Sequence, residues 1–269
     1  MGTQKVFVAG HPMAYHRSGR GETVLLVHGT LTHSVIWREL VPILSERRQV
    51  VVVDLLGCGD SPNPHRLSLS PKAQAEYVAE LVQWLGIGPV HFVGHEVGGA
   101  VGQLLALRHP KLVRSLTLVN SVAGDLWPAW PITALRLPIV RQLFLSLCDT
   151  AIGEWLLRSA LHHREKATPE LVGALRNPLQ TLAGRRAAIH FVSCLDGAEL
   201  AASSPELARL DLPVRIVWGA ADRYLPAGTP ARLQATFPRA TLHRLETAGH
   251  LVPIDEPERL AEILLDGAR

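Results

Sequence analysis

The chain has 269 residues, of which 47% are hydrophobic and 19% are charged. This composition is typical of a globular protein with a sizeable core and excludes a disordered chain. The formal net charge is only +3 and no dense basic run occurs, so nucleic acid is not expected as a partner.

The cysteines and the lack of a signal-peptide pattern indicate in which cellular compartment the protein is expected. Three cysteines lie far apart without a CxxC motif, which favours reduced thiols over disulfides or a metal site. The opening MGTQKVFVAG lacks a signal-peptide pattern, and Val6 breaks the myristoylation pattern. No apolar run reaches membrane-spanning length. We therefore expect a cytoplasmic protein without a membrane partner, and the sequence gives no indication of its oligomeric state.

Short apolar runs alternate with amphipathic stretches through the first half of the chain. The apolar runs predict strands at residues 23–29, 50–57, 90–94 and 112–122. The amphipathic stretches predict helices at residues 34–48, 69–87 and 97–109. Because strands that alternate with helices pair in parallel, we expect an α/β fold with a doubly wound sheet and helices on both faces.

This alternation breaks in the middle of the chain and resumes later. Residues 124–204 are mainly helical in pattern, whereas 213–222 and 240–250 predict strands again. We interpret residues 124–204 as a helical lid inserted into a core domain of residues 1–123 and 205–269. Such an insertion is expected over the carboxyl edge of the sheet, where these folds bind ligands.

The segment GHEVGG, residues 94–99, follows a predicted strand and opens a predicted helix. Its frame is that of a nucleophile elbow, a sharp turn that needs small neighbours because its central residue adopts a strained backbone conformation. Glu96 occupies the central position, where a serine or aspartate is usual. We expect His95 to support the elbow through hydrogen bonds.

These motifs resemble the α/β-hydrolase superfamily over nearly the whole chain. The matching segments are HG at 28–29, DLLGCGDS at 54–61, the elbow at 94–99, WGAAD at 218–222, and AGH at 248–250 followed by EP at 256–257. The resemblance implies a mostly parallel eight-stranded sheet with helices on both faces and a helical lid. Within the superfamily, the chain is most similar to epoxide hydrolases and haloalkane dehalogenases, which carry Asp where Glu96 stands.

A histidine and a second carboxylate complete a candidate triad. His250 lies in a loop after the last predicted strand, and Asp222 ends the preceding one. A histidine base needs its other ring nitrogen oriented and its positive charge balanced, which Asp222 is placed to do. We therefore predict Glu96, Asp222 and His250 as the catalytic residues. The backbone N–H groups of Thr30 and Val97 are the expected oxyanion-hole donors.

A carboxylate nucleophile suits a different target from serine. It needs no deprotonation at neutral pH, and its natural target is a saturated carbon with a leaving group, as in an epoxide or alkyl halide. The product is an ester that water activated by His250 can hydrolyse. The favoured function is therefore hydrolysis of a small or medium hydrophobic substrate: an epoxide, an alkyl halide or an ester-like compound.

The leaving group is not indicated by the sequence. No tyrosine occurs in the lid to protonate an epoxide oxygen, and Val97 stands where a halide-binding tryptophan often follows the nucleophile. The lid instead offers tryptophans. We expect the substrate pocket to be lined by His28, Trp127, Trp130 and Trp155.

Other roles for Glu96 remain open on the sequence. It could be the general base of a lyase, decarboxylase or cyclase that forms no covalent intermediate, paired with a protonated His250. Alternatively, the scaffold could be an inactive ligand-binding protein, or Glu96 an engineered replacement. No phosphate loop, dinucleotide fingerprint or metal motif occurs, so we expect no cofactor and no metal.

Overall fold

The computed structural model describes residues 2–127, 133–134, 137–147 and 151–266. Its centre is an eight-stranded sheet in the order β1-β2-β4-β3-β5-β6-β7-β8. The strands are β1 (Gln4–Val8), β2 (His11–Ser18), β3 (Thr23–Val27), β4 (Gln49–Val53), β5 (Val90–His95), β6 (Val113–Val119), β7 (Val214–Gly219) and β8 (Ala240–Leu245). Pairs that involve β1 or β2 are antiparallel, and all others are parallel. The predicted mostly parallel sheet is confirmed.

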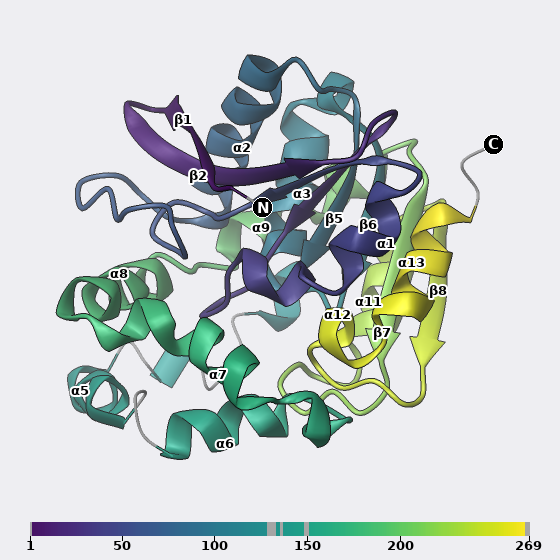
Figure 1. The fold of residues 1–269 in the computed structure, drawn as a ribbon. Helices are drawn as coiled ribbons and strands as arrows, with labels where there is room; N and C mark the ends of the chain where they lie inside the picture. Colours follow the sequence, from purple (N-terminus) through teal and green to yellow (C-terminus); the bar gives the residue numbers. More distant parts are fainter. Residues whose placement is uncertain (1, 128–132, 135–136, 148–150, 267–269) are drawn as a thin grey trace.

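Helices cover both faces of the sheet, as predicted (Figure 1). The core helices are α1 (Leu40–Ser45), α2 (Pro71–Leu85), α3 (Val97–Arg108), α11 (Thr229–Thr236), α12 (Val252–Asp255) and α13 (Pro257–Leu265), with 3-10 turns η1 (Ser34–Trp37) and η2 (Pro110–Leu112). Side chains alternate across the sheet, so Leu25 joins the apolar cluster under α2 and α3, whereas its neighbour Leu26 joins the cluster under α1 and α13. Strands buried on both faces account for the continuous apolar runs in the sequence.

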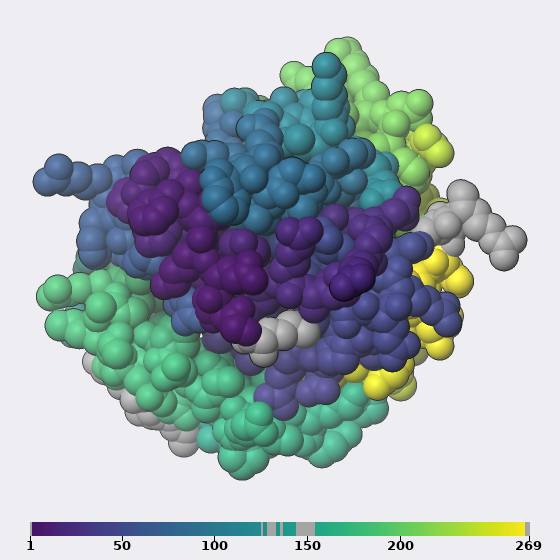
Figure 2. Space-filling view, turned by 45° about the horizontal axis from the view of Figure 1, so that its top comes forward, coloured from purple at the N-terminus to yellow at the C-terminus, as the bar shows by residue number. Residues whose placement is uncertain are grey.

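Between β6 and β7, every regular element that the structure describes is a helix or a 3-10 turn. Its elements are η3 (Gly124–Leu126), α5 (Pro138–Leu147), α6 (Ala151–Ser159), η4 (Arg164–Lys166), α7 (Pro169–Arg176), η5 (Asn177–Gln180), α8 (Leu182–Ser193), α9 (Ala198–Ala202) and α10 (Ser204–Leu207). In Figure 1, α5 to α8 gather at one end of the sheet, and Figure 2 shows the same green segment along the lower edge of the molecule. The division into a lid of 124–204 and a core of 1–123 and 205–269 stays a prediction. Within the described residues, no helix has both the length and the apolar character needed to cross a membrane.

Glycines permit the close contact between α3 and the strand beside it. A Cβ added to Gly98 would lie 2.5 Å from the carbonyl oxygens of both Val27 and His28. Those oxygens belong to the backbone at the end of β3, so they cannot move aside without disturbing the sheet. The same addition at Gly173, inside α7, would meet nothing within 4 Å.

We predict opposite effects of the same substitution in these two helices. Gly98→Ala should lower the free energy of unfolding by about 1–3 kcal/mol, because the methyl group overpacks against backbone. Gly173→Ala should leave stability unchanged or raise it by up to about 1 kcal/mol, because alanine is the better helix former. Urea unfolding of both variants tests this, and equal stability of the two would contradict the close contact.

Candidate active site

The elbow places Glu96 in a strained conformation at the end of β5 and the start of α3. Its φ and ψ are 48° and −113°, a combination that is rare for a residue with a side chain. The Glu96 N–H donates to the Val119 carbonyl at 3.2 Å, and the Ser121 hydroxyl donates to the Glu96 carbonyl at 3.3 Å. The residue is only 4% exposed. Neighbouring strands therefore hold the strained turn in place.

The carboxylate of Glu96 reaches the loop after β3. The Thr30 N–H donates a hydrogen bond to Glu96 Oε2, with 2.6 Å between nitrogen and oxygen. Gly29 makes this approach possible, because a Cβ there would lie 2.9 Å from Oε2. The N–H of Val97 is among the first of α3, and such groups have no acceptor within their own helix. The structure thus brings together the elbow carboxylate and the two predicted oxyanion-hole residues.

His250 and Asp222 meet beside the elbow. The distance from His250 Nδ1 to Asp222 Oδ2 is 2.9 Å. The Asp222 side chain is only 1% exposed, and the His250 side chain is 14% exposed. Asp222 Oδ1 accepts from the N–H groups of Tyr224 and Leu225. A carboxylate held on one side by backbone donors orients the imidazole on the other.

Charges within the site shift the pKa of both groups. Burial acts to lower the pKa of His250, but the charge and hydrogen bond of Asp222 and the charge of Glu96 outweigh it, so the pKa rises above its ordinary value. Burial acts to raise the pKa of Asp222, but His250 and the Asn120 hydrogen bond outweigh that effect and lower it. The arrangement therefore stabilises an imidazolium between two carboxylates.

His95 and His28 are neutral supports around this site. Burial lowers the pKa of His95 to about 3 and that of His28 to about 4. His95 Nε2 donates to the His250 carbonyl at 2.9 Å, as expected of a support for the elbow. His28 Nδ1 donates to the Gly29 carbonyl at 2.9 Å, and its Nε2 accepts from Leu55 N–H at 3.0 Å.

The structure separates the residues predicted to line the pocket. His28 has both ring nitrogens engaged by backbone, so it holds the loop after β3 instead of presenting a polar group to substrate. Trp155, on α6, is 63% exposed, and its place in the pocket stays a prediction, because an amphipathic pattern does not say which face of a helix is covered. Trp127 is 5% exposed, and its buried indole N–H has no assigned hydrogen-bond partner among the described residues. Trp130 lies outside the described residues.

Sequence reasoning missed two residues that shape this site. Asn120, directly after β6, has φ of 37°, donates to Asp222 Oδ2 at 2.6 Å and accepts from Gly219 N–H at 2.9 Å. Its one sequence signal is that asparagine tolerates left-handed backbone better than most residues. The second is Asp255.

No group of three or more metal-ligating side chains is arranged to hold an ion in the described part of the chain.

Asp255 joins the loop of His250 to residues 162 and 163, which belong to the predicted lid. This carboxylate is 1% exposed and accepts from the N–H groups of Gly249 at 2.7 Å, His162 at 3.0 Å and His163 at 2.9 Å. Beside it, the His250 N–H donates to the Ala160 carbonyl at 2.8 Å. The backbone of the proposed base is therefore fixed to residues 160–163 of the predicted lid.

We predict that Asp255→Asn lowers the free energy of unfolding by about 1–3 kcal/mol, because an amide NH₂ faces buried N–H donors that then lack an acceptor. The matched control is Glu258→Gln, an exposed carboxylate three residues away, which should stay within about 0.5 kcal/mol of the native chain. Urea unfolding measures both. A neutral effect of Asp255→Asn would contradict this role of the carboxylate.

We also predict the titration order of the histidines. In an NMR titration of the imidazole nitrogens, His250 should titrate above its ordinary pKa of 6.5, whereas His95 and His28 should stay neutral above pH 5. Asp222→Asn should lower the pKa of His250, because it removes the carboxylate charge and leaves burial to favour the neutral ring. A His250 pKa that is unchanged in Asp222→Asn would contradict this account.

Comparison with known proteins agrees with the architecture. A family model described as alpha/beta hydrolase fold matches residues 22–257. Similar curated proteins include an uncharacterized hydrolase, YugF, of Bacillus subtilis, at 25% identity over 94% of this chain and 91% of the relative. A pimeloyl-[acyl-carrier protein] methyl ester esterase of Aeromonas hydrophila is 29% identical, over 94% of this chain and 97% of the relative. Haloalkane dehalogenase 2 of Mycobacterium tuberculosis is 26% identical, over 94% and 90%.

Solved structures show the same fold. Cfl2 from Burkholderia cenocepacia has a TM-score of 0.88 at 22% identity, with 99% of this chain and 95% of that chain covered. The epoxide hydrolase CorEH has a TM-score of 0.79 at 21% identity, with 98% and 97% covered. At these identities the likeness establishes the fold alone.

Proposed function

The chain belongs to the α/β hydrolase fold family, and from that premise we propose that it hydrolyses a small or medium hydrophobic substrate through a covalent ester on Glu96. In this proposal Glu96 is the nucleophile, His250 the base that activates water, and Asp222 the group that orients His250. Relatives named as dehalogenase and esterase support a hydrolytic reaction without selecting one leaving group.

One observation carries the proposal: Glu96 Oε2 accepts the Thr30 N–H at 2.6 Å. A carboxylate anchored through one oxygen presents the other, Oε1, to a substrate. Oε1 attacks a saturated carbon, the new C–O bond forms, and the bond to the leaving group breaks with its electron pair. A halide departs as the anion, whereas an epoxide oxygen stays attached and takes a proton.

The same hydrogen bond serves the second step. His250 Nε2 takes a proton from water, and the water oxygen attacks the carboxyl carbon of the Glu96 ester. Negative charge develops on Oε2, which already lies at the Thr30 N–H, with the Val97 N–H as the second predicted donor. The intermediate collapses with release of the alkoxide, which takes the proton from His250. Asp222 stabilises the imidazolium in between.

Glutamate has a longer side chain than aspartate and therefore needs more space at the elbow. One extra methylene moves the carboxylate by about 1.5 Å, and a misplacement of about 1 Å costs about a hundredfold in rate. Gly29 provides that room, because any Cβ there would lie within 2.9 Å of both Glu96 Cβ and Oε2. The loop after β3 therefore fits a glutamate at the elbow.

A second candidate, non-covalent catalysis, is favoured by one observation. The charge of Glu96 contributes to the raised pKa of His250, so the two side chains interact electrostatically. A Glu96 paired with a protonated His250 would suit general-base chemistry without an ester intermediate.

We predict that His250→Ala accumulates a covalent adduct, because the ester forms but no base activates water to break it. Intact-mass analysis after incubation with 1,2-epoxyhexane and 1-bromohexane measures this. The epoxide would add its whole mass, and the bromide an alkyl group less one hydrogen. Peptide mapping should place the adduct on Glu96.

The control is the double variant that carries both Glu96→Gln and His250→Ala. It should show no adduct, because an amide is a poor nucleophile. Turnover by the native chain without an adduct in His250→Ala would favour general-base catalysis. Binding without turnover by the native chain would favour a ligand-binding protein.

A further inference from the structure

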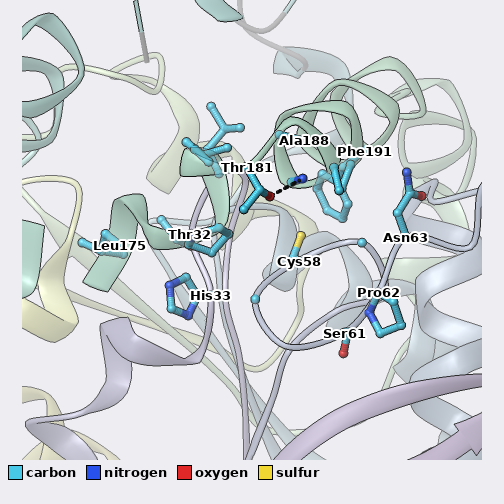
Figure 3. A pocket seen from close by; sticks show the side chains of 18 of the residues that line it. Thr32, His33, Cys58, Ser61, Pro62, Asn63, Leu175, Thr181, Ala188 and Phe191 are labelled. Carbon is cyan, nitrogen blue, oxygen red and sulfur yellow. Dashed lines mark hydrogen bonds between the residues drawn. The ribbon is translucent and has the colours of Figure 1, made fainter. Parts of the chain in front are cut away.

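A cavity of about 370 Å³ lies between the predicted lid and the core, and the proposed catalytic residues Glu96, Asp222 and His250 do not line it. Its core walls come from residues 31–33, 57–59, 61–63 and 65, and its walls from the predicted lid are residues 175, 178–179, 181, 183–184, 187–188 and 191. Figure 3 shows the loop of Cys58, Ser61 and Pro62 facing Ala188 and Phe191 of α8. The volume falls in the range of about 300–1,000 Å³ that is typical of small-molecule sites.

The lining of this cavity is mainly apolar. None of the described lining residues is Asp, Glu, Lys or Arg, and its two histidines, His33 and His65, are hydrogen-bonded within the protein. Apolar surface comes from Leu31, Pro62, Leu175, Leu179, Ala188 and Phe191. The polar side chains are largely engaged within the protein: the Thr32 hydroxyl donates to the Gly29 carbonyl, and the Thr181 hydroxyl accepts from Gly184 N–H. Such a lining favours an uncharged, apolar ligand, since a charged group would lose its hydration without gaining a partner.

The cavity begins beside the proposed oxyanion hole. Leu31 lines it and directly follows Thr30, and consecutive Cα atoms are about 3.8 Å apart. Leu31 has φ of 57°, an uncommon conformation for a bulky residue. This local strain accompanies a loop that directs the Thr30 N–H to Glu96 while Leu31 forms a wall of the cavity. One wall of the cavity is therefore formed by the residue that directly follows the donor to the Glu96 carboxylate.

We propose that this cavity binds an uncharged apolar substituent of the substrate, an alkyl chain or ring attached to the carbon that Glu96 attacks. The proposal rests on the proposed function and narrows its substrate class to elongated compounds with an apolar tail. Each methylene buried in such a site strengthens binding by up to about fourfold. A tail longer by four methylenes should therefore bind at least about tenfold more tightly, even if burial is incomplete.

Equilibrium binding of unreactive probes tests the site. The neutral fluorophore N-phenyl-1-naphthylamine reports occupancy, and 1-butanol and 1-octanol, the alcohols that alkyl halide hydrolysis would release, compete with it. Ala188→Trp fills the cavity and should weaken binding of the fluorophore and of 1-octanol at least tenfold. The matched control, Leu182→Trp, adds the same side chain to the same helix at a position that is 63% exposed and outside the cavity, and it should stay within twofold of the native chain.

A second variant covers the case in which Ala188→Trp fails to fold, as circular dichroism would show. Leu179→Ala enlarges the cavity and should increase the preference for 1-octanol over 1-butanol or extend it to 1-decanol. Affinities that are the same in the native chain, in folded Ala188→Trp and in Leu179→Ala would overturn the proposal.

These probes do not react, so the result is independent of the chemistry at Glu96. Suppose that Ala188→Trp loses alcohol binding and that His250→Ala forms no adduct. This result would support ligand binding in the cavity and would contradict the proposed covalent reaction. Suppose instead that adducts form on Glu96 and that Ala188→Trp leaves the alcohol affinities unchanged. This result would support the covalent reaction and would contradict substrate binding in the cavity.

Discussion

The hydrogen bond from Thr30 N–H to Glu96 Oε2 joins the ends of two neighbouring parallel strands, β3 and β5. It forms only because backbone from the two strands approaches more closely than side chains would allow. Gly29 has no room for a Cβ beside the carboxylate, and Gly98 has none beside the carbonyls that end β3. The strained turn at Glu96 and the register of β3 against β5 together fix the position of the Glu96 carboxylate. The proposed chemistry depends on that position.

Electrostatic interactions and backbone hydrogen bonds hold His250 at the same site. The negative charges of Asp222 and Glu96 together raise the pKa of the His250 imidazole, against the effect of burial, which alone would lower it. Its backbone is held by hydrogen bonds to the Ala160 carbonyl and from His95 Nε2, while Asp255 fixes the adjoining turn to residues 162–163. Because residues 160–163 belong to the predicted lid, the geometry of the proposed base and the seating of the lid are physically linked. The cavity next to Thr30 lies between the same two parts of the chain.

Prediction from the sequence succeeded where a pattern reports local structure. The alternation of apolar runs and amphipathic stretches gave the parallel strands and the helices on both faces, and the GHEVGG segment gave the elbow. It was incomplete where two distant elements decide the outcome. Trp155 lies on an amphipathic helix, but the pattern does not say that its side chain is 63% exposed. His28 stands directly after β3, but only the folded chain shows that both its ring nitrogens are already hydrogen-bonded to backbone.

By itself, the sequence determined the order of strands and helices, the glycine-rich turn around Glu96, and the identity of Asp222 and His250 as its candidate partners, because periodicity and turn chemistry are local properties. Tertiary structure alone decided that the Thr30 N–H bonds to one carboxylate oxygen of Glu96, that Asn120 and Asp255 hold Asp222 and the turn before His250, and that a mainly apolar cavity opens beside Leu31. Most of these contacts join residues far apart in the sequence: 66 positions for Thr30 and Glu96, 102 for Asn120 and Asp222, and 93 for His162 and Asp255. No local pattern encodes the distance between such residues in the folded chain.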